Sequence, residues 1–248
     1  MLNRLRVSAL PRLGALAFAG AVAVIPSGSA GAQATPARSA TVAVMEFESS
    51  AMVRPEQFAA ITTGLQVMLA SALQTNPNVR VVERTKLDEV IKEQNLGTAG
   101  RLDPSTAARV GKLIGAGHML FGTIVVQPDM ETRLMVRSIN SETGALEYSE
   151  SVVGKGDKIF NLLDQLATKL NAGLKLPGDR DREAAKREGL DGPNQLEAIT
   201  AIHAAERYKD KGDYKSAAEY LQKALKLNPA IGYARRDLAT IERRTPQD

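Results

Sequence analysis

The sequence of 248 residues contains no cysteine and only two histidines. Without cysteine the chain has no disulfides and no thiol to carry a lipid anchor, although a chain of this length buries an ordinary core without cross-links. The two histidines, His118 and His203, lie in different segments. A two-histidine metal helix or a histidine-centred catalytic triad needs close partners, and neither histidine has them in the sequence. We therefore expect no metal, no cofactor and no catalytic residue.

A long apolar run and an excess of one charge are also missing from most of the chain. Residues 1–32 hold three arginines and no acidic residue, which leaves 29 basic against 28 acidic residues in the remainder. No basic stripe is visible, so nucleic acid is not an expected partner. Beyond residue 32 no run approaches the roughly 20 apolar residues of a membrane helix. We expect no membrane-spanning segment in the mature chain.

The N-terminus carries the pattern of an export signal. A basic start is followed by an apolar run at 13–25, and Ala30 and Ala32 form the A-x-A pattern of a cleavage site. These three parts predict a secretory signal over 1–32, cut after Ala32. An uncleaved anchor or a buried helix is the alternative, but the run is too short for a bilayer. We expect a periplasmic protein, and leave open a peripheral position at the outer membrane.

After a flexible lead-in at 33–40, apolar patterning over 41–174 predicts an α/β domain. The expected strands are 41–47, 79–82, 118–127, 130–140 and 146–153. The expected helices are 56–74, a segment around Leu87, one starting at Asp103-Pro104, and 157–174. Alternating residues make the last two strands a hairpin, and helical periodicity places one apolar face of each helix on the sheet. The fold class is α/β (α+β), with a mixed sheet of about five strands flanked by helices.

A linker at 175–193 leads to a helical module at 194–245. Its spacing resembles a single tetratricopeptide (TPR) repeat, carried by Tyr208, Gly212-Asp213-Tyr214, Ala217, Leu221, Ala224 and Pro229. The match is partial, because alanines stand at consensus positions of the first helix. The resemblance implies an all-α helical hairpin, closed by a capping helix around 233–243.

Protein binding along the first helix of this module is what the TPR resemblance implies. By spacing, the residues that share a face there are Ile199, Ile202, Glu206 and Lys209. The alternative is that the hairpin packs on the α/β domain or pairs with a second copy of itself. Both readings stay open at this point.

Three short strings in the α/β segment carry a second resemblance. They are 42–47 (VAVMEF), 81–84 (VVER) and 111–116 (GKLIGA). In this order they resemble the curli production assembly and transport (CsgG) family. That resemblance implies a mixed-sheet domain working in the periplasm on secretion or envelope assembly. The family's channel member is a lipoprotein with inserted membrane hairpins, and this chain has neither the cysteine nor the extra hairpins.

Glu46 and Glu48 form the one carboxylate pair in a plausible cleft position. Alternate residues of a strand point to one face, as general acid–base chemistry would require. No basic or metal-binding partner is identifiable in the sequence, which favours a solvated strand end. Glu83 and Arg84 could form an ion pair at a strand-to-helix corner.

The sequence predicts a non-enzymatic periplasmic scaffold or adaptor in cell-envelope assembly or curli-like secretion. Its expected partners are other envelope proteins, bound through the α/β domain and the TPR-like module, and a homo-oligomer is possible. One alternative is an exported hydrolase using Glu46 and Glu48. Another is a pore subunit of an outer-membrane secretion channel.

Overall fold

The computed structural model describes residues 39–96, 102–176 and 194–244. The predicted signal at 1–32, nearly all of the lead-in at 33–40 and most of the linker at 175–193 lie outside the described residues. The domain boundaries proposed from the sequence therefore remain predictions.

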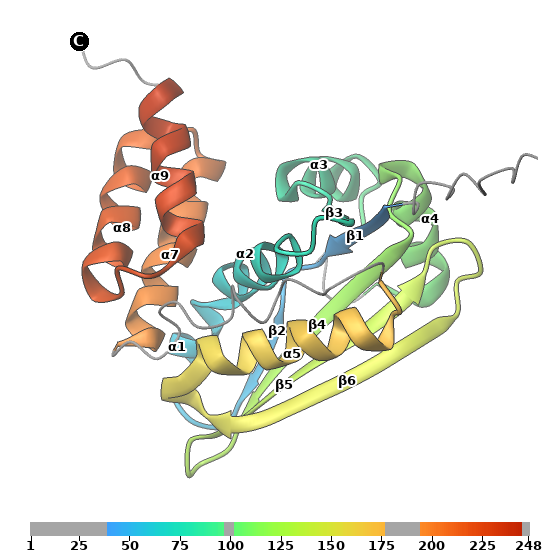
Figure 1. Ribbon diagram of the computed structural model, residues 1–248, viewed down its shortest axis with the longest axis horizontal. Coiled ribbons are helices and arrows are strands. Elements are labelled where there is room, and N and C mark those ends of the chain that lie inside the picture. The colour runs from blue at the N-terminus through green and yellow to red at the C-terminus, as the bar shows by residue number, and fades with distance from the viewer. Residues whose placement is uncertain (1–38, 97–101, 177–193, 245–248) are drawn as a thin grey trace, which may run out of the picture. The chain divides into compact units, whose positions relative to one another are not determined.

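A mixed β-sheet forms the centre of the α/β part (Figure 1). Its strands are β1 (Ala40–Val44), β2 (Glu48–Ala51), β3 (Val79–Val81), β4 (His118–Val126), β5 (Glu131–Asn140) and β6 (Leu146–Lys155). The order across the sheet is β3-β1-β4-β5-β6, and β2 pairs with β4 beyond the end of β1. The pairs among β1 to β4 are parallel, whereas β4-β5 and β5-β6 are antiparallel. The predicted mixed sheet is confirmed. Strands β1 and β2 pair with β4 one after the other along its length, so together they occupy one of five positions across the sheet.

The first predicted strand, 41–47, is wrong at its end, because the chain leaves the sheet after Val44. Val44 lies opposite Leu120, and pairing resumes with Glu48 opposite Thr123. Three residues of the chain, 45–47, thus face two residues of β4. One extra residue interrupts the ladder in the manner of a β-bulge and changes which side the following residues face.

The helices of the α/β part are α1 (Pro55–Ala59), α2 (Thr62–Leu73), α3 (Arg84–Glu93), α4 (Pro104–Ile114) and α5 (Ile159–Gly173), which follows the 3-10 turn η2 (Gly156–Lys158). The predicted helix 56–74 is two helices, separated at Ala60 and Ile61. The predicted start of α4 is confirmed, since the Asp103 carboxylate accepts hydrogen bonds from the backbone N–H groups of Ser105 and Thr106.

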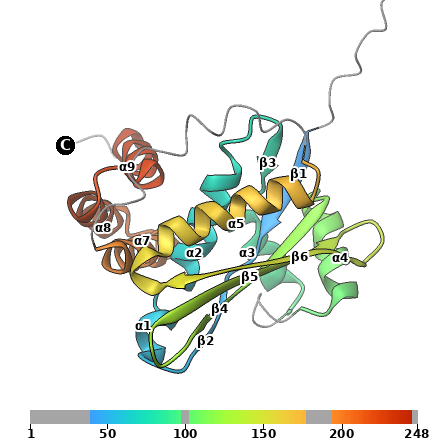
Figure 2. The same cartoon turned by 60° about the horizontal axis from the view of Figure 1, so that its bottom comes forward.

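Helices cover both faces of the sheet (Figure 2). Helices α2 and α5 bury one face, with Leu65, Leu69 and Leu163 among the core residues. Helices α3 and α4 cover part of the other face, where Leu87 and Val110 pack in a second core. Alternate residues of β1 and β4 therefore point into different cores, as the pleat of a strand requires.

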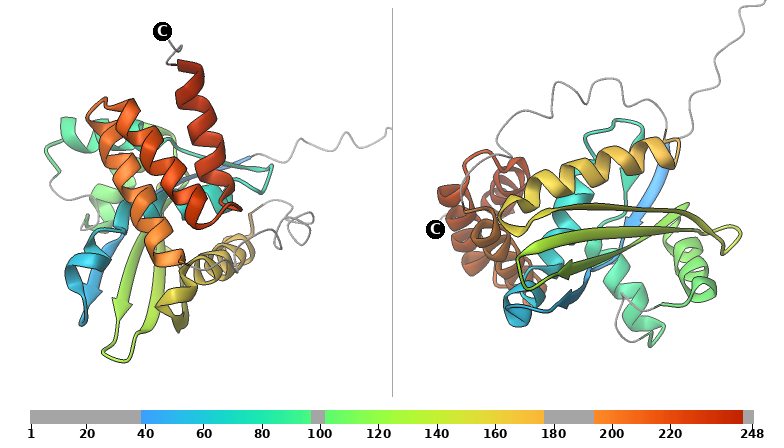
Figure 3. Two further views of the ribbon diagram at one scale, coloured as in Figure 1. Left: turned by 90° about the vertical axis from the view of Figure 1, so that its left-hand side faces the viewer. Right: turned by 90° about the horizontal axis from the view of Figure 1, so that it is seen from below.

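Three packed helices follow: α7 (Gln195–Asp210), α8 (Tyr214–Leu227) and α9 (Gly232–Arg244) (Figure 3). The turn between α7 and α8 contains Gly212, whose φ of 75° suits glycine. Ala217 and Ala224 of α8 are fully buried. A C-terminal helical region after the sheet, as expected from the sequence, is confirmed.

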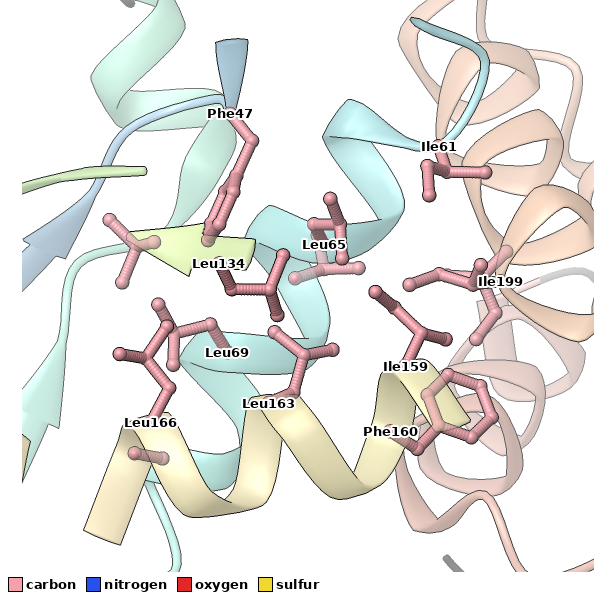
Figure 4. Close-up of a cluster of buried hydrophobic side chains, with 14 of the residues drawn as sticks. Phe47, Ile61, Leu65, Leu69, Leu134, Ile159, Phe160, Leu163, Leu166 and Ile199 are labelled. Atoms are coloured by element: carbon pink, nitrogen blue, oxygen red, sulfur yellow. The ribbon is translucent and has the colours of Figure 1, made fainter. Parts of the chain in front are cut away.

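Helix α7 packs against α2 and closes the core of the α/β part. Ile199 of α7 points into the same cluster as Ile61 and Ile159 (Figure 4). The approach is close at Gly64 of α2, where an added Cβ would lie 2.7 Å from the carbonyl oxygen of Ile199. Glycine at this position lets the two helices approach backbone to backbone. The C-terminal helices thus share one hydrophobic core with the sheet.

Candidate functional site

Glu46 lies in the interruption between β1 and β2 and faces the beginning of α2. Its Oε1 accepts hydrogen bonds from the hydroxyl groups of Thr62, at 2.9 Å, and Thr63, at 2.8 Å. The residue before α2, Ile61, offers no side-chain cap. A carboxylate beside a helix N-terminus is favourable, because the helix dipole is positive there. Glu46 therefore fixes the first turn of α2 from outside the helix.

The prediction that Glu46 and Glu48 point to one face is wrong. Glu46 contacts α2, on the face of the sheet that α2 and α5 bury. Glu48 pairs with Thr123, whose neighbour Ile124 belongs to that same buried face. Since adjacent strand residues alternate, Thr123 and Glu48 point to the opposite face. The extra residue at 45–47 breaks the alternation that would have placed the two carboxylates on one side.

Arg84, the first residue of α3, connects the α/β part to α7. Its guanidinium lies 2.8 Å from Asp88, 3.1 Å from Glu206 and in direct contact with Asp210. Burial alone would lower the pKa of Arg84, but these three carboxylates raise it above its ordinary value. The sequence suggested Glu83 as its partner, whereas the structure pairs Arg84 with residues on its own helix and on α7.

Glu206 continues this network into α9. Lys209 lies 2.9 Å from Glu206 and 2.9 Å from Asp237, and the Tyr233 hydroxyl donates to Glu206. Burial raises the pKa of Tyr233 well above its ordinary value, and the neighbouring carboxylates add to that effect. Buried charges are stable only when paired and hydrogen-bonded, and this chain of contacts supplies both. We call these residues, Arg84, Asp88, Glu206, Lys209, Asp210, Tyr233 and Asp237, the junction network.

The four residues expected to bind a partner differ in how far they are exposed. Ile199 and Ile202 are fully buried, and Glu206 is 2 % exposed. Lys209 is partly exposed and belongs, with Glu206, to the junction network. In this structure the α7 face that they share is covered by the chain's own α2, α3 and α9. Partner binding by these residues remains a prediction, and it would require that packing to open.

An open, solvent-facing pocket with a volume of about 520 Å³ lies between α2, α3 and α7, and residues of the junction network form part of its lining. Its charged lining residues are Glu46, Arg84, Asp88, Lys92, Arg207 and Asp210. Ile91 and Leu96 provide an apolar wall. The volume falls within the range of small-molecule sites. We call this pocket the junction cleft.

Sequence reasoning marked Glu46 and Arg84 separately but did not bring them together. Arg84 and Glu206 are 122 positions apart, and no local pattern links them. The one available signal was the presence of charged residues on α7 at helical spacing from Ile199 and Ile202.

The two histidines have separate surroundings in the structure. His118 Nδ1 lies 2.6 Å from Glu147 Oε1, which also accepts a hydrogen bond from Ser138. The buried Nδ1 of His203 has no hydrogen-bond partner among the residues that the structure describes. Within residues 39–96, 102–176 and 194–244, no group of three histidine, aspartate or glutamate side chains is arranged to hold a metal ion. Over the same ranges, no helix has the length and apolar character needed to cross a membrane.

Comparisons with solved structures give distant likenesses in fold. The LpoB C-terminal domain from Salmonella enterica is 15% identical, with 49% of this chain and 87% of that chain covered and a TM-score of 0.37. Lipoprotein GNA1162 from Neisseria meningitidis is 15% identical over 54% of this chain and 96% of that chain, at a TM-score of 0.41. A PelC dodecamer from Paraburkholderia phytofirmans is 17% identical over 57% and 91%, at 0.30.

No curated protein matches the chain. The sequence model of one family matches residues 27–154, which is more than half of the chain. That match begins before β1 and ends near the end of β6, so it covers every strand of the sheet. The chain therefore belongs to the family of the curli production assembly/transport component CsgG.

Proposed function

We propose that this protein is a non-enzymatic periplasmic scaffold or adaptor in envelope assembly or curli-like secretion. It acts through protein–protein contacts of its α/β part and of its C-terminal helices. Family membership is the observation that carries the proposal, because the family is described as a component of curli production, assembly and transport. The predicted secretory signal at 1–32 supports a periplasmic location.

The arrangement of charged groups also supports a binding role. Arg84, Glu206 and Lys209 are engaged with one another and with neighbouring carboxylates. Glu46 is held by two threonine hydroxyls, and Glu48 lies on the other face of the sheet. Acid–base catalysis requires two groups that converge on one substrate position. The carboxylates suggested for a hydrolase do not converge.

The TPR resemblance of the C-terminal helices is part of the proposal. Helices α7 and α8 meet at Gly212, and Tyr208 stacks on Tyr220 with ring centroids 5.3 Å apart. Fully buried Ala217 and Ala224 allow the close approach that such a hairpin requires. The apolar side of a single helical hairpin needs another element to pack against. Here α9 and α2 provide that contact.

Crosslinking in living cells tests this proposal. A photoreactive amino acid is placed at Met135, which is 40% exposed on β5, and in a second variant at Lys223, which is exposed on α8. We expect each variant, expressed at its native level, to form an adduct with another envelope protein that mass spectrometry identifies.

A chain without residues 2–32 serves as the control, because it lacks the predicted signal. It should lose these adducts if the contacts occur in the periplasm. Recovery of monomer alone from both probe positions would contradict the scaffold proposal. Adducts that contain only copies of this chain would contradict binding to other envelope proteins. They would indicate self-assembly instead.

A further inference from the structure

The junction cleft orders its charges from the inside outward. Arg84 is 11% exposed at its inner wall, and Asp210 and Asp88 are 29% and 47% exposed. Arg207 is 60% exposed and Lys92 is also exposed, so both cations lie toward solvent. The inner wall therefore presents carboxylates around one shared arginine, and the outer part presents cations.

Asp88 depends most on Arg84, because Glu206 also lies 2.9 Å from Lys209 and Asp210 lies 3.9 Å from Arg207. Arg84 is shared by Asp88, Asp210 and Glu206. Burial raises the pKa of Asp88, and the neighbouring charges of Asp210 and Glu46 raise it further, although Arg84 opposes them. Like charges held close together favour the binding of a positive group between them.

Glu46 has unused capacity to bind such a group. Both threonine hydroxyls donate to Oε1. A carboxylate can accept about four hydrogen bonds, so Oε2 remains available. Among the described residues, no lysine or arginine forms an ion pair with Glu46 within 4 Å.

The outer cations favour the opposite charge. Arg207 approaches Asp210 only at 3.9 Å, which leaves most of its donors free. An arginine guanidinium binds a carboxylate through two parallel hydrogen bonds. A ligand with an ammonium group at one end and a carboxylate at the other matches this order of charges.

We propose that the junction cleft binds a small zwitterion of the amino acid or short-peptide class. Its ammonium group lies between Glu46 and Asp88, and its carboxylate meets Arg207 at the mouth. Ile91 and Leu96 contact its apolar side chains. This inference goes beyond the proposed scaffold role, because it assigns a small-molecule ligand to a site built from α2, α3 and α7.

Titration calorimetry on the mature chain (residues 33–248) tests this with three probes. The first is L-alanyl-L-alanine, which has both charged ends. The second is its N-acetyl derivative, which lacks the ammonium group, and the third is its C-terminal amide, which lacks the carboxylate. Free L-alanine is added to distinguish a single amino acid from a dipeptide. We expect the free dipeptide or alanine to bind at least about tenfold more tightly than either blocked form, since each charged hydrogen bond contributes that much or more.

Two variants assign the ends of the ligand. Glu46→Gln keeps an oxygen for the threonine hydroxyls and should remove the preference for a free ammonium group. Arg207→Gln should remove the preference for a free carboxylate. Lys223→Gln, on the exposed face of α8 outside the cleft, should change neither preference.

Asp88→Asn provides a second test of the ammonium end if Glu46→Gln fails to fold by circular dichroism. Absence of binding by all four compounds would overturn the proposal. Binding that is equally strong for the blocked and free dipeptides would overturn it as well, because the charges would then play no part.

Discussion

Arg84 on α3 and Glu206 on α7 form a largely buried ion pair, with 3.1 Å between Nη2 and Oε2. The side chain of Glu206 is 3% exposed, and that of Arg84 is 11% exposed. The pair joins the first turn of a helix that covers the sheet to the last turns of a helix in the C-terminal region. Its polar contact adds to the apolar contact between α2 and α7, so the two regions are held by two kinds of interaction.

Replacing Arg84 by methionine should strongly destabilise the protein. Arg84→Met keeps the apolar stem but leaves the Glu206 carboxylate without one of its two cations in a buried position. Removal of one partner of a buried ion pair costs about 3–5 kcal/mol in the free energy of unfolding. Urea denaturation of the variant and of the wild type measures this difference.

Two further variants separate the ion pair from general packing. In the Arg84→Met background, Glu206→Gln should recover part of the loss, because position 206 then no longer carries a buried charge that Lys209 alone has to balance. Lys155 and Asp129 are 4.0 Å apart and both well exposed, so Lys155→Met should change the free energy of unfolding by less than about 1 kcal/mol. Equal effects of Arg84→Met and Lys155→Met would contradict the role given to the junction network.

Gly64→Ala should weaken the contact between α2 and α7. The added methyl group would lie 2.7 Å from the Ile199 carbonyl oxygen and 2.9 Å from its side chain. Overpacking of this kind costs about 1–3 kcal/mol, even though alanine is the better helix former. Gly232→Ala is the matched control, since its new methyl group would meet only the flexible end of Arg236. Thermal unfolding should show a lower Tm for Gly64→Ala alone.

His203 makes the stability of the protein depend on pH near neutrality. Burial lowers the pKa of His203 below its ordinary value of 6.5; Glu46 and Asp210 oppose this, and Arg207 and Arg84 reinforce it. Below pH 6.5 the unfolded chain therefore binds a proton more readily than the folded chain. Stability should fall as the pH drops from 6.5 towards the lower pKa of the folded state, and then level off.

The variant His203→Gln should lose this part of the pH dependence. Urea midpoints at pH 7.5 and pH 5.5 give the comparison, with the wild type measured in parallel. An unchanged difference between the two pH values would show that His203 is as accessible to protons in the folded state as in the unfolded one.

Glu147 should give a pH dependence of the same sign as His203, at a more acidic pH. Burial alone would raise its pKa, but hydrogen bonds with Ser138, His118 and Asn140 more than offset burial, and the pKa lies below its ordinary value of 4.5. Its contribution to stability is present above pH 4.5 and is lost as the pH falls through the lower folded-state pKa. In an NMR titration, Ser138→Ala should raise the carboxyl pKa of Glu147. A pKa that stays in place would mean that the Ser138 hydrogen bond does not stabilise the carboxylate.

Features with a local cause could be predicted from the sequence. Asp103 followed by Pro104 predicted the start of α4, because a carboxylate before the first turn accepts its free N–H groups. Gly115 and Gly212 predicted two helix ends, since their backbone angles favour glycine. Alternation over 130–153 predicted the β5-β6 hairpin, with its pleated, half-buried pattern.

Features that depend on a distant neighbour could not be predicted in the same way. The interruption after Val44 is defined only by the pairing with β4, where three residues oppose two. That single extra residue changed the side on which Glu48 lies relative to a regular strand, so the simple alternation used for Glu46 and Glu48 does not hold. The spacing of Ile199 and Ile202 predicted that they share one face of α7, with partner binding or packing on the α/β domain both left open, and it did not identify what covers that face.

By itself, the sequence determined the mixed sheet, its flanking helices and the C-terminal helical region, because hydrophobic periodicity and capping residues act within a few positions of one another. Only the tertiary structure decided that Glu46 accepts hydrogen bonds from the Thr62 and Thr63 hydroxyls of α2, that Arg84 joins α3 to α7, and that a charged cleft lies between them. Those contacts link residues as many as 122 positions apart, and a local pattern carries no information about which distant charges burial will bring together.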